Sequence, residues 1–320
     1  MTTAFTFPGQ GSQAVGMGKA LADAYPEARA VFDEVDEALG EKLSATIWDG
    51  PANALTLTEN AQPALMAVSL AATRVLASRG APIASSAAFV AGHSLGEYSA
   101  LAAAGALSVG DAARLLRTRG RAMQEAVPVG AGAMAALIGL DLETVAAVAA
   151  EAAEGAVCSA ANDNGGGQVV VSGDKAAVER AVEIAKAKGA RRAVLLPVSA
   201  PFHCALMAPA AEVMRAALAE VTLNAPVVPI VANVTARPTS DAEEIRRNLV
   251  TQVTAMVRWR ESIVWLAEAG VDRFVEVGAG KVLSGLARRI ADGVATMTAG
   301  TPEDIEAAVS QLGADEVKNV

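Results

Sequence analysis

The chain has 320 residues, of which 52% are hydrophobic, 19% charged and 3% aromatic, enough for about two folding units around an aliphatic core. This composition excludes a disordered chain, and a formal net charge of -9 argues against binding to nucleic acid or to anionic membranes. Two cysteines, an N-terminus without signal-peptide features and apolar runs shorter than the roughly 20 residues of a membrane span lead us to expect a cytoplasmic protein.

The first 126 residues alternate between strand-like and helix-like segments. Short apolar runs that end in glycine-containing polar turns predict strands, and apolar spacing of three and four residues predicts helices. The predicted strands are residues 3–7 and 87–91, and the predicted helices end near residue 39, cover 62–78, end at Gly105 and cover 109–126. Strand, loop and helix thus follow one another twice, which is typical of a parallel α/β sheet.

From residue 130 the segments become shorter and follow the order βαββαβ. They are residues 133–139, 142–154, 156–161, 168–172, 175–188 and 192–197. After residue 201 the first pattern resumes, with strands at 227–231 and 273–277 and helices at 242–254 and 259–269. We therefore expect an α/β fold: a large α/β-hydrolase-like core with a parallel sheet, residues 1–129 and 199–320, and an inserted ferredoxin-like small subdomain, residues 130–198.

The pentapeptide Gly92-His93-Ser94-Leu95-Gly96 has the form G-x-S-x-G and stands between a predicted strand and a predicted helix, the context of a nucleophile elbow. Both glycines fit this interpretation because bulkier residues two positions from Ser94 would clash in so tight a turn. The N–H of Leu95 at the helix start, and one from the Gly9-Gln10-Gly11 loop, are candidate oxyanion donors. The alternative is an ordinary glycine-flanked turn with a solvent-facing serine.

A serine hydroxyl needs a base to become a nucleophile, and the chain contains two histidines. His93 adjoins Ser94 on the elbow, where its side chain should point away, so His203 in a predicted loop is the better candidate. Asp163 and Asp174 are the nearest preceding acids of a Ser-Asp-His hydrolase, but both fall in turns of the small unit. We expect a backbone carbonyl or an amide side chain to orient the histidine instead.

Three glycine-rich stretches invite comparison with nucleotide-binding loops, and none fits. The stretch at 9–14 lacks a second strand ending in an acid about 20 residues later, and the stretch at 130–135 lacks a preceding strand. The stretch at 278–281 lacks the first glycine of a phosphate loop. The histidines and cysteines show no zinc-ligand spacing. We therefore expect neither a nucleotide nor a metal.

Five segments, in order along nearly the whole chain, resemble the malonyl-CoA:acyl carrier protein transacylases of fatty acid synthesis. They are residues 7–13, 92–98, 119–124, 201–207 and 276–283. The resemblance implies transfer of a malonyl group from malonyl-CoA to the pantetheine thiol of an acyl carrier protein, through an ester on Ser94 and with ping-pong kinetics. It implies malonyl-CoA and acyl carrier protein as binding partners and no cofactor; we expect a monomer.

The resemblance also implies roles for single residues. Ser94 is the nucleophile, His203 the base, Gln252 the group that orients His203 through its carbonyl, and the N–H groups of Gln10 and Leu95 are the oxyanion donors. Arg119 binds the malonyl carboxylate, for which a planar guanidinium with two parallel donors is well suited, although a solvated helix charge is the simpler interpretation. The other implied substrate contacts are Met123, His93, Asn162, Asn164, Arg191 and Phe202.

Two of these contacts carry further expectations. The ring of Phe202, directly before the histidine, resembles that of family members that select malonyl because it leaves no room for an α-methyl group. The turn at 162–167 departs from the family's pattern, with an acid and an extra glycine where an aromatic and a proline are frequent.

Two other classes of function share parts of this pattern. A serine esterase or thioesterase has the same elbow and histidine, and a non-catalytic module would only dock a carrier protein. Since carrier proteins are usually acidic, docking to a chain of net charge -9 requires a local basic face, for which we select Lys281, Arg288 and Arg289.

Overall fold

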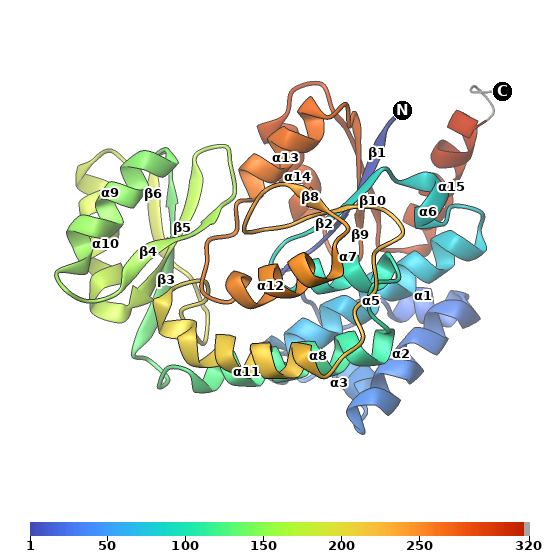
Figure 1. Cartoon of the computed structure of the whole chain (residues 1–320), viewed down its shortest axis with the longest axis horizontal. Coiled ribbons are helices and arrows are strands. Elements are labelled where there is room, and N and C mark those ends of the chain that lie inside the picture. The colour runs from blue at the N-terminus through green and yellow to red at the C-terminus, as the bar shows by residue number, and fades with distance from the viewer. Residues whose placement is uncertain (317–320) are drawn as a thin grey trace.

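The computed structural model describes residues 1–316 and contains two separate sheets (Figure 1). The strands of the larger sheet are β1 (Thr3–Phe7), β2 (Phe89–Gly92), β7 (Ile230–Val231), β8 (Pro238–Thr239), β9 (Arg273–Val277) and β10 (Ala295–Ala299). Their order across the sheet is β10-β9-β1-β2-β7-β8, and all neighbours are parallel except β7 and β8. The carboxyl ends of the parallel strands therefore lie along one edge.

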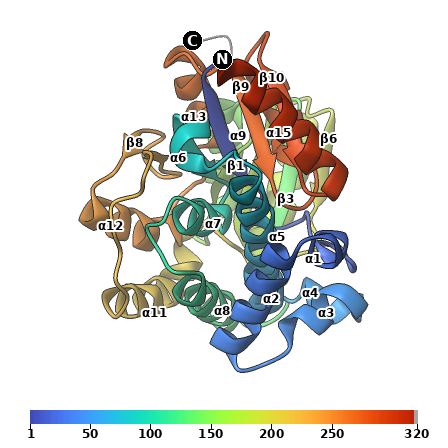
Figure 2. The same ribbon diagram turned by 90° about the vertical axis from the view of Figure 1, so that its right-hand side faces the viewer.

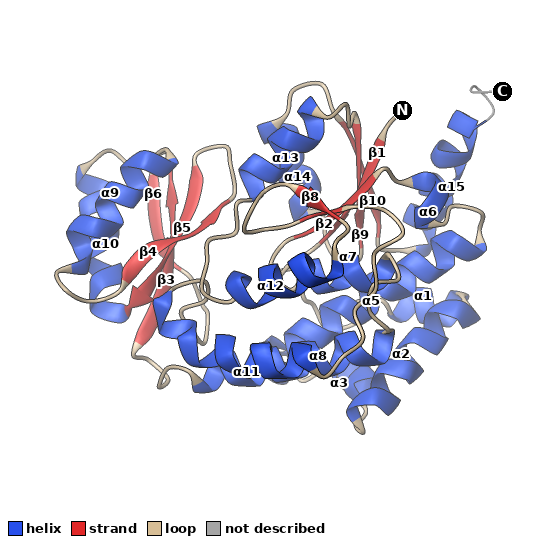
Figure 3. Ribbon diagram, viewed as in Figure 1, coloured by secondary structure: helices blue, strands red, loops and turns tan. Residues whose placement is uncertain are grey.

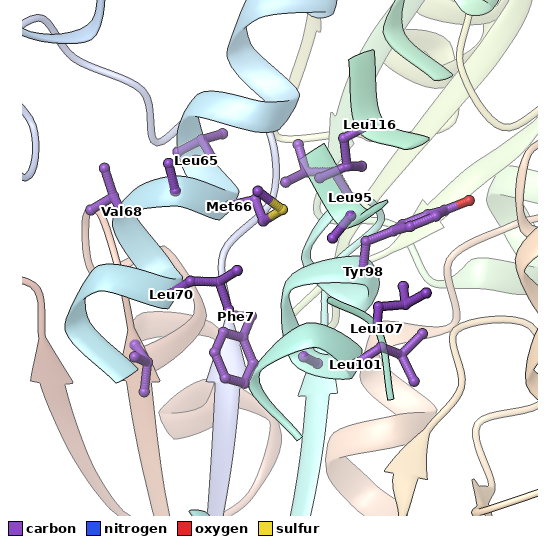
Figure 4. Packing of buried hydrophobic residues seen from close by; sticks show 14 of the residues in the cluster. Phe7, Leu65, Met66, Val68, Leu70, Leu95, Tyr98, Leu101, Leu107 and Leu116 are labelled. Carbon is purple, nitrogen blue, oxygen red and sulfur yellow. The ribbon is translucent and has the colours of Figure 1, made fainter. Parts of the chain in front are cut away.

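Alternate residues of the central strands enter different cores, so both faces of the larger sheet are buried. Phe5 and Phe7 of β1 belong to one hydrophobic cluster. Ala4 of the same strand belongs to a second cluster, on the opposite face of the sheet. Figure 4 shows Phe7 against residues of the first cluster, among them Leu70 and Leu101. A parallel sheet needs such cover on both faces, because its connections cross over it as helices.

The helices around the larger sheet cover both of its faces (Figure 3). They are α1 (Lys19–Ala24), α2 (Pro26–Leu39), α3 (Leu43–Asp49), α4 (Ala52–Thr56), α5 (Thr58–Ser78), α6 (Ile83–Ser86), α7 (Gly96–Ala103), α8 (Val109–Glu125), α11 (Ala208–Ala219), α12 (Ala242–Gln252), α13 (Trp259–Glu268), α14 (Val282–Ile290) and α15 (Pro302–Glu316), with a short 3₁₀ turn, Ala205–Met207. α2, α8 and α11 form a row along one side (Figure 2). Among the described residues, no helix has both the length and the apolar character needed to span a membrane.

The smaller sheet is antiparallel and follows the ferredoxin-like order β4-β5-β3-β6. Its elements are β3 (Gly132–Ile138), α9 (Leu142–Ala153), β4 (Cys158–Asp163), β5 (Gln168–Asp174), α10 (Lys175–Ala187) and β6 (Arg192–Leu195). Ala135 and Leu137 of β3 pack with α9 and α10, whereas Met134 and Ala136 belong to the core of the larger part. The predicted α/β class, a parallel core with a ferredoxin-like unit, is confirmed.

Several elements differ from the prediction. The helix predicted up to residue 39 is two helices, because Pro26 cannot continue α1 and instead occupies the first position of α2. The helix predicted at 62–78 begins four positions earlier, at Thr58. The sequence patterns did not predict α3, α4, α6, α11, α14, α15, β8 or β10.

Candidate active site

Ser94 stands in a strained turn between β2 and α7, with a backbone φ of 54°. A Cβ atom on Gly92 would lie 1.9 Å from the carbonyl oxygen of Gly96, and one on Gly96 would lie 2.2 Å from that of Phe7. Such distances leave room for glycine alone at both positions. The turn therefore has the geometry of a nucleophile elbow, in which the serine side chain is lifted above the sheet.

The carboxyl ends of β1, β2 and β7, which are neighbours in the sheet, bring three segments together. They carry Gln10, Ser94 and Asn233 respectively. The buried side chain of Asn233 accepts a hydrogen bond from the Ser94 N–H at 2.8 Å and donates one to the Gly92 carbonyl at 2.7 Å. Asn233 thus clamps the elbow from the strand beside it.

His203 lies beside the serine hydroxyl, with its Nε2 atom 2.8 Å from Ser94 Oγ. Its Nδ1 atom lies 2.9 Å from the backbone oxygen of Gln252 and 3.1 Å from that of Ala255. Because carbonyl oxygens only accept, Nδ1 carries the proton and Nε2 is free to accept one from Ser94. Backbone carbonyls therefore orient this histidine.

The two acids considered from the sequence are engaged elsewhere. Asp163 accepts a hydrogen bond from Arg260 Nε at 2.7 Å, and Asp174 accepts one from the Val157 N–H at 2.7 Å.

Burial, followed by the charge of Arg119, lowers the pKa of His203 to about 3. The imidazole is consequently neutral at neutral pH, which is the form that a general base needs.

Arg119 is buried at the site, with 2% of its surface exposed, and is not a solvated helix charge. Its Nη2 atom donates to Ser94 Oγ at 3.1 Å and to Gln252 Oε1 at 2.8 Å, and its Nη1 atom donates to Gln62 Oε1 at 2.8 Å. Its Nε atom is buried without an acceptor in residues 1–316. The site therefore holds a buried guanidinium that touches the serine hydroxyl and has one unsatisfied donor.

The loop after β1 lies directly against the elbow, because a Cβ atom on Gly9 would come within 2.7 Å of the His93 carbonyl oxygen. Gln10 is fixed there by its side chain, whose Oε1 accepts a hydrogen bond from Thr58 Oγ1 at 2.9 Å. The N–H groups of Gln10 and Leu95 have no acceptor within the described part of the chain. Both residues line the same cavity as Ser94.

This cavity has a volume of about 450 Å³ and lies between the two sheets. Of the residues expected to act on the substrate, it is lined by Gln10, His93, Ser94, Leu95, Arg119, Met123, Asn162, Phe202 and His203. Met134 of β3 and Leu196, directly after β6, also line it. The cavity is therefore built jointly by the core and the ferredoxin-like unit.

Three expected site residues do not line the cavity. Gln252 lies behind it, bonded to Arg119, and Asn164 bonds the ring Nε2 of His93 at 2.9 Å. His93 therefore bonds the small unit instead of Ser94, although its ring still lines the cavity. Arg191 lines a second cavity of about 970 Å³ together with Gly139, Asp163 and Arg260.

Sequence reasoning gave no role to Glu97, Gln62 or Asn233. Glu97 and Asn233 form hydrogen bonds behind the site, and Gln62 lines the cavity and bonds Arg119. Glu97 is buried, and burial raises its pKa to about 7. An acid inside the apolar run at 95–105 was a signal for it, and an amide directly after a strand was a signal for Asn233. Gln62 lies on a helix that is buried along most of its length, and its polarity was the available signal.

The N–H groups at the start of α14, directly after the glycine-rich stretch, already have an acceptor within the protein. The carboxylate of Glu276 accepts hydrogen bonds from the N–H of Leu283 at 3.0 Å and from that of Ser284 at 2.7 Å. These are the donors that would hold a phosphate at a helix N-terminus. Among residues 1–316 there is also no cluster of three or more histidine, cysteine or acidic side chains suited to a metal ion.

Comparison with known proteins assigns this arrangement to a family. The profile of the acyl transferase domain matches residues 4–296. The chain belongs to the acyl transferase family. It is 49% identical over 308 residues to the malonyl CoA-acyl carrier protein transacylase of Escherichia coli (strain K12), covering 96% of this chain and 98% of the relative. The resemblance found in the sequence is thereby confirmed, and the protein is an acyltransferase.

Solved structures agree with this membership. The acyl-carrier-protein-S-malonyltransferase of Bartonella henselae superposes with a TM-score of 0.96 at 60% identity, covering 98% of this chain and 100% of that one. A malonyl-transacylase in complex with its type II polyketide synthase acyl-carrier protein superposes with a TM-score of 0.94 at 42% identity, covering 97% and 100%. The fold of this acyltransferase is therefore shared along nearly its whole length.

Proposed function

We propose that this acyltransferase moves a malonyl group from malonyl-CoA to the pantetheine thiol of an acyl carrier protein through an ester on Ser94. The observation that carries the proposal is the pair of contacts at Ser94 Oγ: His203 Nε2 at 2.8 Å and Arg119 Nη2 at 3.1 Å. A base and a fixed cation thus meet at one hydroxyl. A simple esterase has use for the first and none for the second.

In the first half-reaction, Ser94 Oγ attacks the thioester carbonyl while its proton passes to Nε2 of His203. The N–H groups of Gln10 and Leu95 hold the negative oxygen of the tetrahedral intermediate. The intermediate then expels the CoA sulfur, which takes the proton from His203. In the second half-reaction the carrier thiol gives its proton to His203 and attacks the acyl-Ser94 ester. The ester C–O bond then breaks, His203 returns the proton to Ser94 Oγ, and the carrier leaves with the malonyl group as a thioester.

Arg119 gives the site its preference for a carboxylated acyl group. The malonyl carboxylate is separated from the ester carbonyl by a single methylene, so it lies within a few bonds of Ser94 Oγ and within reach of the guanidinium. Met123 provides an apolar wall, and the ring of Phe202 occupies the space that an α-methyl group would need. A neutral acyl group in the same place would leave the buried charge of Arg119 without a partner of opposite charge.

The small unit, whose bounds we place at residues 130–198 between core segments 1–129 and 199–320, contributes the proposed CoA contacts. Asn162 lines the catalytic cavity, and Asn164 fixes His93. Arg191, in the second cavity, is the proposed partner of a CoA phosphate. Phosphate binding there would be assisted by Arg260, whose charge is shared with Asp163.

Lys281, Arg288 and Arg289 are the proposed docking face for the acidic carrier. All three are exposed, and Arg289 packs beside the turn that holds Asn164, since a Cβ atom on Gly166 would lie 3.5 Å from the Cβ of Arg289. Reversing single charges there should weaken transfer to the carrier more than acylation by malonyl-CoA. Equal effects on both steps would contradict docking at this face.

Three finer expectations belong to the same proposal. The reaction exchanges one thioester for another, so it requires no cofactor or metal. A reducing cytoplasm suits the free thiols of Cys158 and Cys204. We also place the protein as a monomer that acts without nucleic acid or membrane, in fatty acid or polyketide synthesis.

Intact-mass spectrometry tests the proposed function directly. Wild-type protein incubated with malonyl-CoA should gain the mass of one malonyl group, and Ser94→Ala should gain none. Adding a carrier protein with its pantetheine arm should then move that mass to the carrier. Free malonate in place of a stable adduct would identify a hydrolase and contradict the proposal.

A further inference from the structure

Glu97 is a buried acid behind the active site that the reaction described above does not use. It is the second residue of α7, three positions after Ser94, and 1% of its surface is exposed. Burial raises the pKa of its carboxyl to about 7, although hydrogen bonds from Gln252 and Asn233 and the charge of Arg119 offset part of this effect. A buried acid in such a place is expected to have a specific task.

The carboxylate of Glu97 binds two groups of the site through one oxygen. Its Oε2 atom accepts hydrogen bonds from Gln252 Nε2 at 2.7 Å and from the Asn233 N–H at 3.2 Å. A backbone N–H only donates, so the bond from Asn233 makes Oε2 an acceptor whether or not the other carboxyl oxygen carries a proton. Only the NH₂ end of the Gln252 amide can therefore face Glu97.

The opposite end of the same amide faces Arg119. Gln252 Oε1 accepts the hydrogen bond from Arg119 Nη2, while Gln252 Nε2 also donates to the Ser94 carbonyl oxygen at 3.0 Å. A flipped amide would set its NH₂ group against the guanidinium and lose the hydrogen bonds at both ends. The orientation of the amide and the position of Arg119 are consequently coupled.

We propose that Glu97 is a positioning residue that locks the Gln252 amide and thereby holds the Arg119 guanidinium beside Ser94, so that the enzyme selects carboxylated acyl groups. The inference rests on the proposed function, because it requires a carboxylate at Arg119. The histidine is outside this path, since His203 bonds the backbone of Gln252 and not its side chain. Glu97 should therefore govern acyl selection more than acyl transfer as such.

Two substitutions separate the acceptor from the charge. Glu97→Gln keeps an oxygen that can take the place of Oε2, so its malonyl-over-acetyl preference should stay close to that of the wild type. Glu97→Met fills a similar volume without an acceptor, and its preference should fall on the order of 10- to 100-fold, as for a misplaced catalytic group. Acetyl is the reference acyl group because it has no carboxylate for Arg119.

The measurement is the single-turnover rate of Ser94 acylation by malonyl-CoA and by acetyl-CoA, followed by intact mass, with thermal unfolding of each variant alongside. The matched control is Glu276→Gln, which alters a buried acid that caps α14 away from the site and should leave the preference unchanged. Gln252→Leu keeps the backbone carbonyl and should lose the preference as Glu97→Met does. The double variant should lose no more than Gln252→Leu alone.

Three results would overturn the inference. They are an equal loss for both acyl groups in Glu97→Met, a Glu97→Gln protein that behaves like Glu97→Met, and an unchanged preference in Gln252→Leu. The last result decides the matter even if Glu97→Met does not fold. A wild type that forms no malonyl adduct would overturn the proposed function itself, and the inference with it.

Discussion

The Nδ1 atom of His203 lies 2.9 Å from the backbone carbonyl oxygen of Gln252, so the main chain and not an acidic side chain orients this histidine. The side chain of Gln252 is thereby left to bond Arg119. The Nδ1 atom faces backbone carbonyl oxygens, and among residues 1–316 the charge that acts most strongly on the imidazole is the positive one of Arg119. The pH behaviour and the substrate preference of the enzyme both follow from this division.

Removal of the Arg119 guanidinium should separate malonyl from acetyl transfer. In Arg119→Ala the rate of acylation by malonyl-CoA should fall about 10²–10⁴-fold, because two charge-assisted hydrogen bonds of about 1.5–3 kcal/mol each are lost. Acylation by acetyl-CoA should persist. Arg119→Lys, which keeps the charge without the planar fork, should fall between wild type and alanine variant in the same mass-spectrometric assay. Undiminished malonyl transfer in Arg119→Ala would contradict the assignment.

Acylation should not show the acid limb of an ordinary histidine. The pKa of His203 is lowered to about 3, so its base form is present above that pH and is lost only as the pH falls through it. The pH profile of acylation, measured with malonyl-N-acetylcysteamine because this thioester has no phosphate to titrate, should therefore lack a limb near 6.5.

Two variants check the origin of any limb that does appear in that profile. Glu97→Gln removes the neighbouring acid, whose pKa burial raises to about 7, so a limb that comes from Glu97 should disappear in this variant. Arg119→Ala removes the charge that contributes to the low pKa of His203, so it should move the limb of the histidine to higher pH. A limb near 6.5 that Glu97→Gln retains would contradict a depressed histidine.

Loss of the Asn233 clamp should slow both acyl groups alike. Asn233→Ala leaves the N–H of Ser94 and the carbonyl of Gly92 without their partner, which should destabilise the fold by about 1–3 kcal/mol. Acylation should fall on the order of 10²-fold, because the hydroxyl is no longer held in line with the base. Asn224→Ala, at an exposed position, is the control. A selective loss of malonyl transfer would show that Asn233 acts on Arg119 and not on the elbow.

Substitution of an elbow glycine should be among the most damaging small changes in the chain. Gly92→Ala forces a Cβ atom to within 1.9 Å of Gly96, so the free energy of unfolding in urea should fall by about 3 kcal/mol or more. Gly285→Ala is the matched control, because nothing lies within 4 Å of its Cβ position and α14 favours alanine by about 0.5–1 kcal/mol. Equal stability of the two variants would refute the steric argument.

Elements buried on both faces were the most predictable from the sequence. The bounds of β1 and β9 agree with the predicted strands, because both are continuous buried runs that end in glycine-containing turns. α11 and α14 were not predicted, since each is short, with 12 and 9 residues, and follows directly on a loop without a separate start signal. At Pro26 the apolar spacing predicts one continuous helix, whereas the proline predicts a break, and the structure follows the proline.

The candidate site divides in the same way. Ser94 and Arg119 stand in recognisable local motifs, and the structure brings both His203 and Arg119 to the Ser94 hydroxyl. The partners behind them are distant in the chain: Glu97 bonds Asn233, which lies 136 positions later. No local pattern encodes such a contact, because it depends on which strands become neighbours in the sheet.

The bond from Glu276 to the start of α14 has a consequence for the interpretation of sequences. The backbone N–H groups of a glycine-rich turn can bind a phosphate only if no acceptor within the protein already bonds them. Here an acid two positions ahead of the turn answers them. In other chains, an acid at that spacing before a similar turn should therefore lower the expectation of a nucleotide site, because its carboxylate can occupy the N–H groups that a phosphate would need.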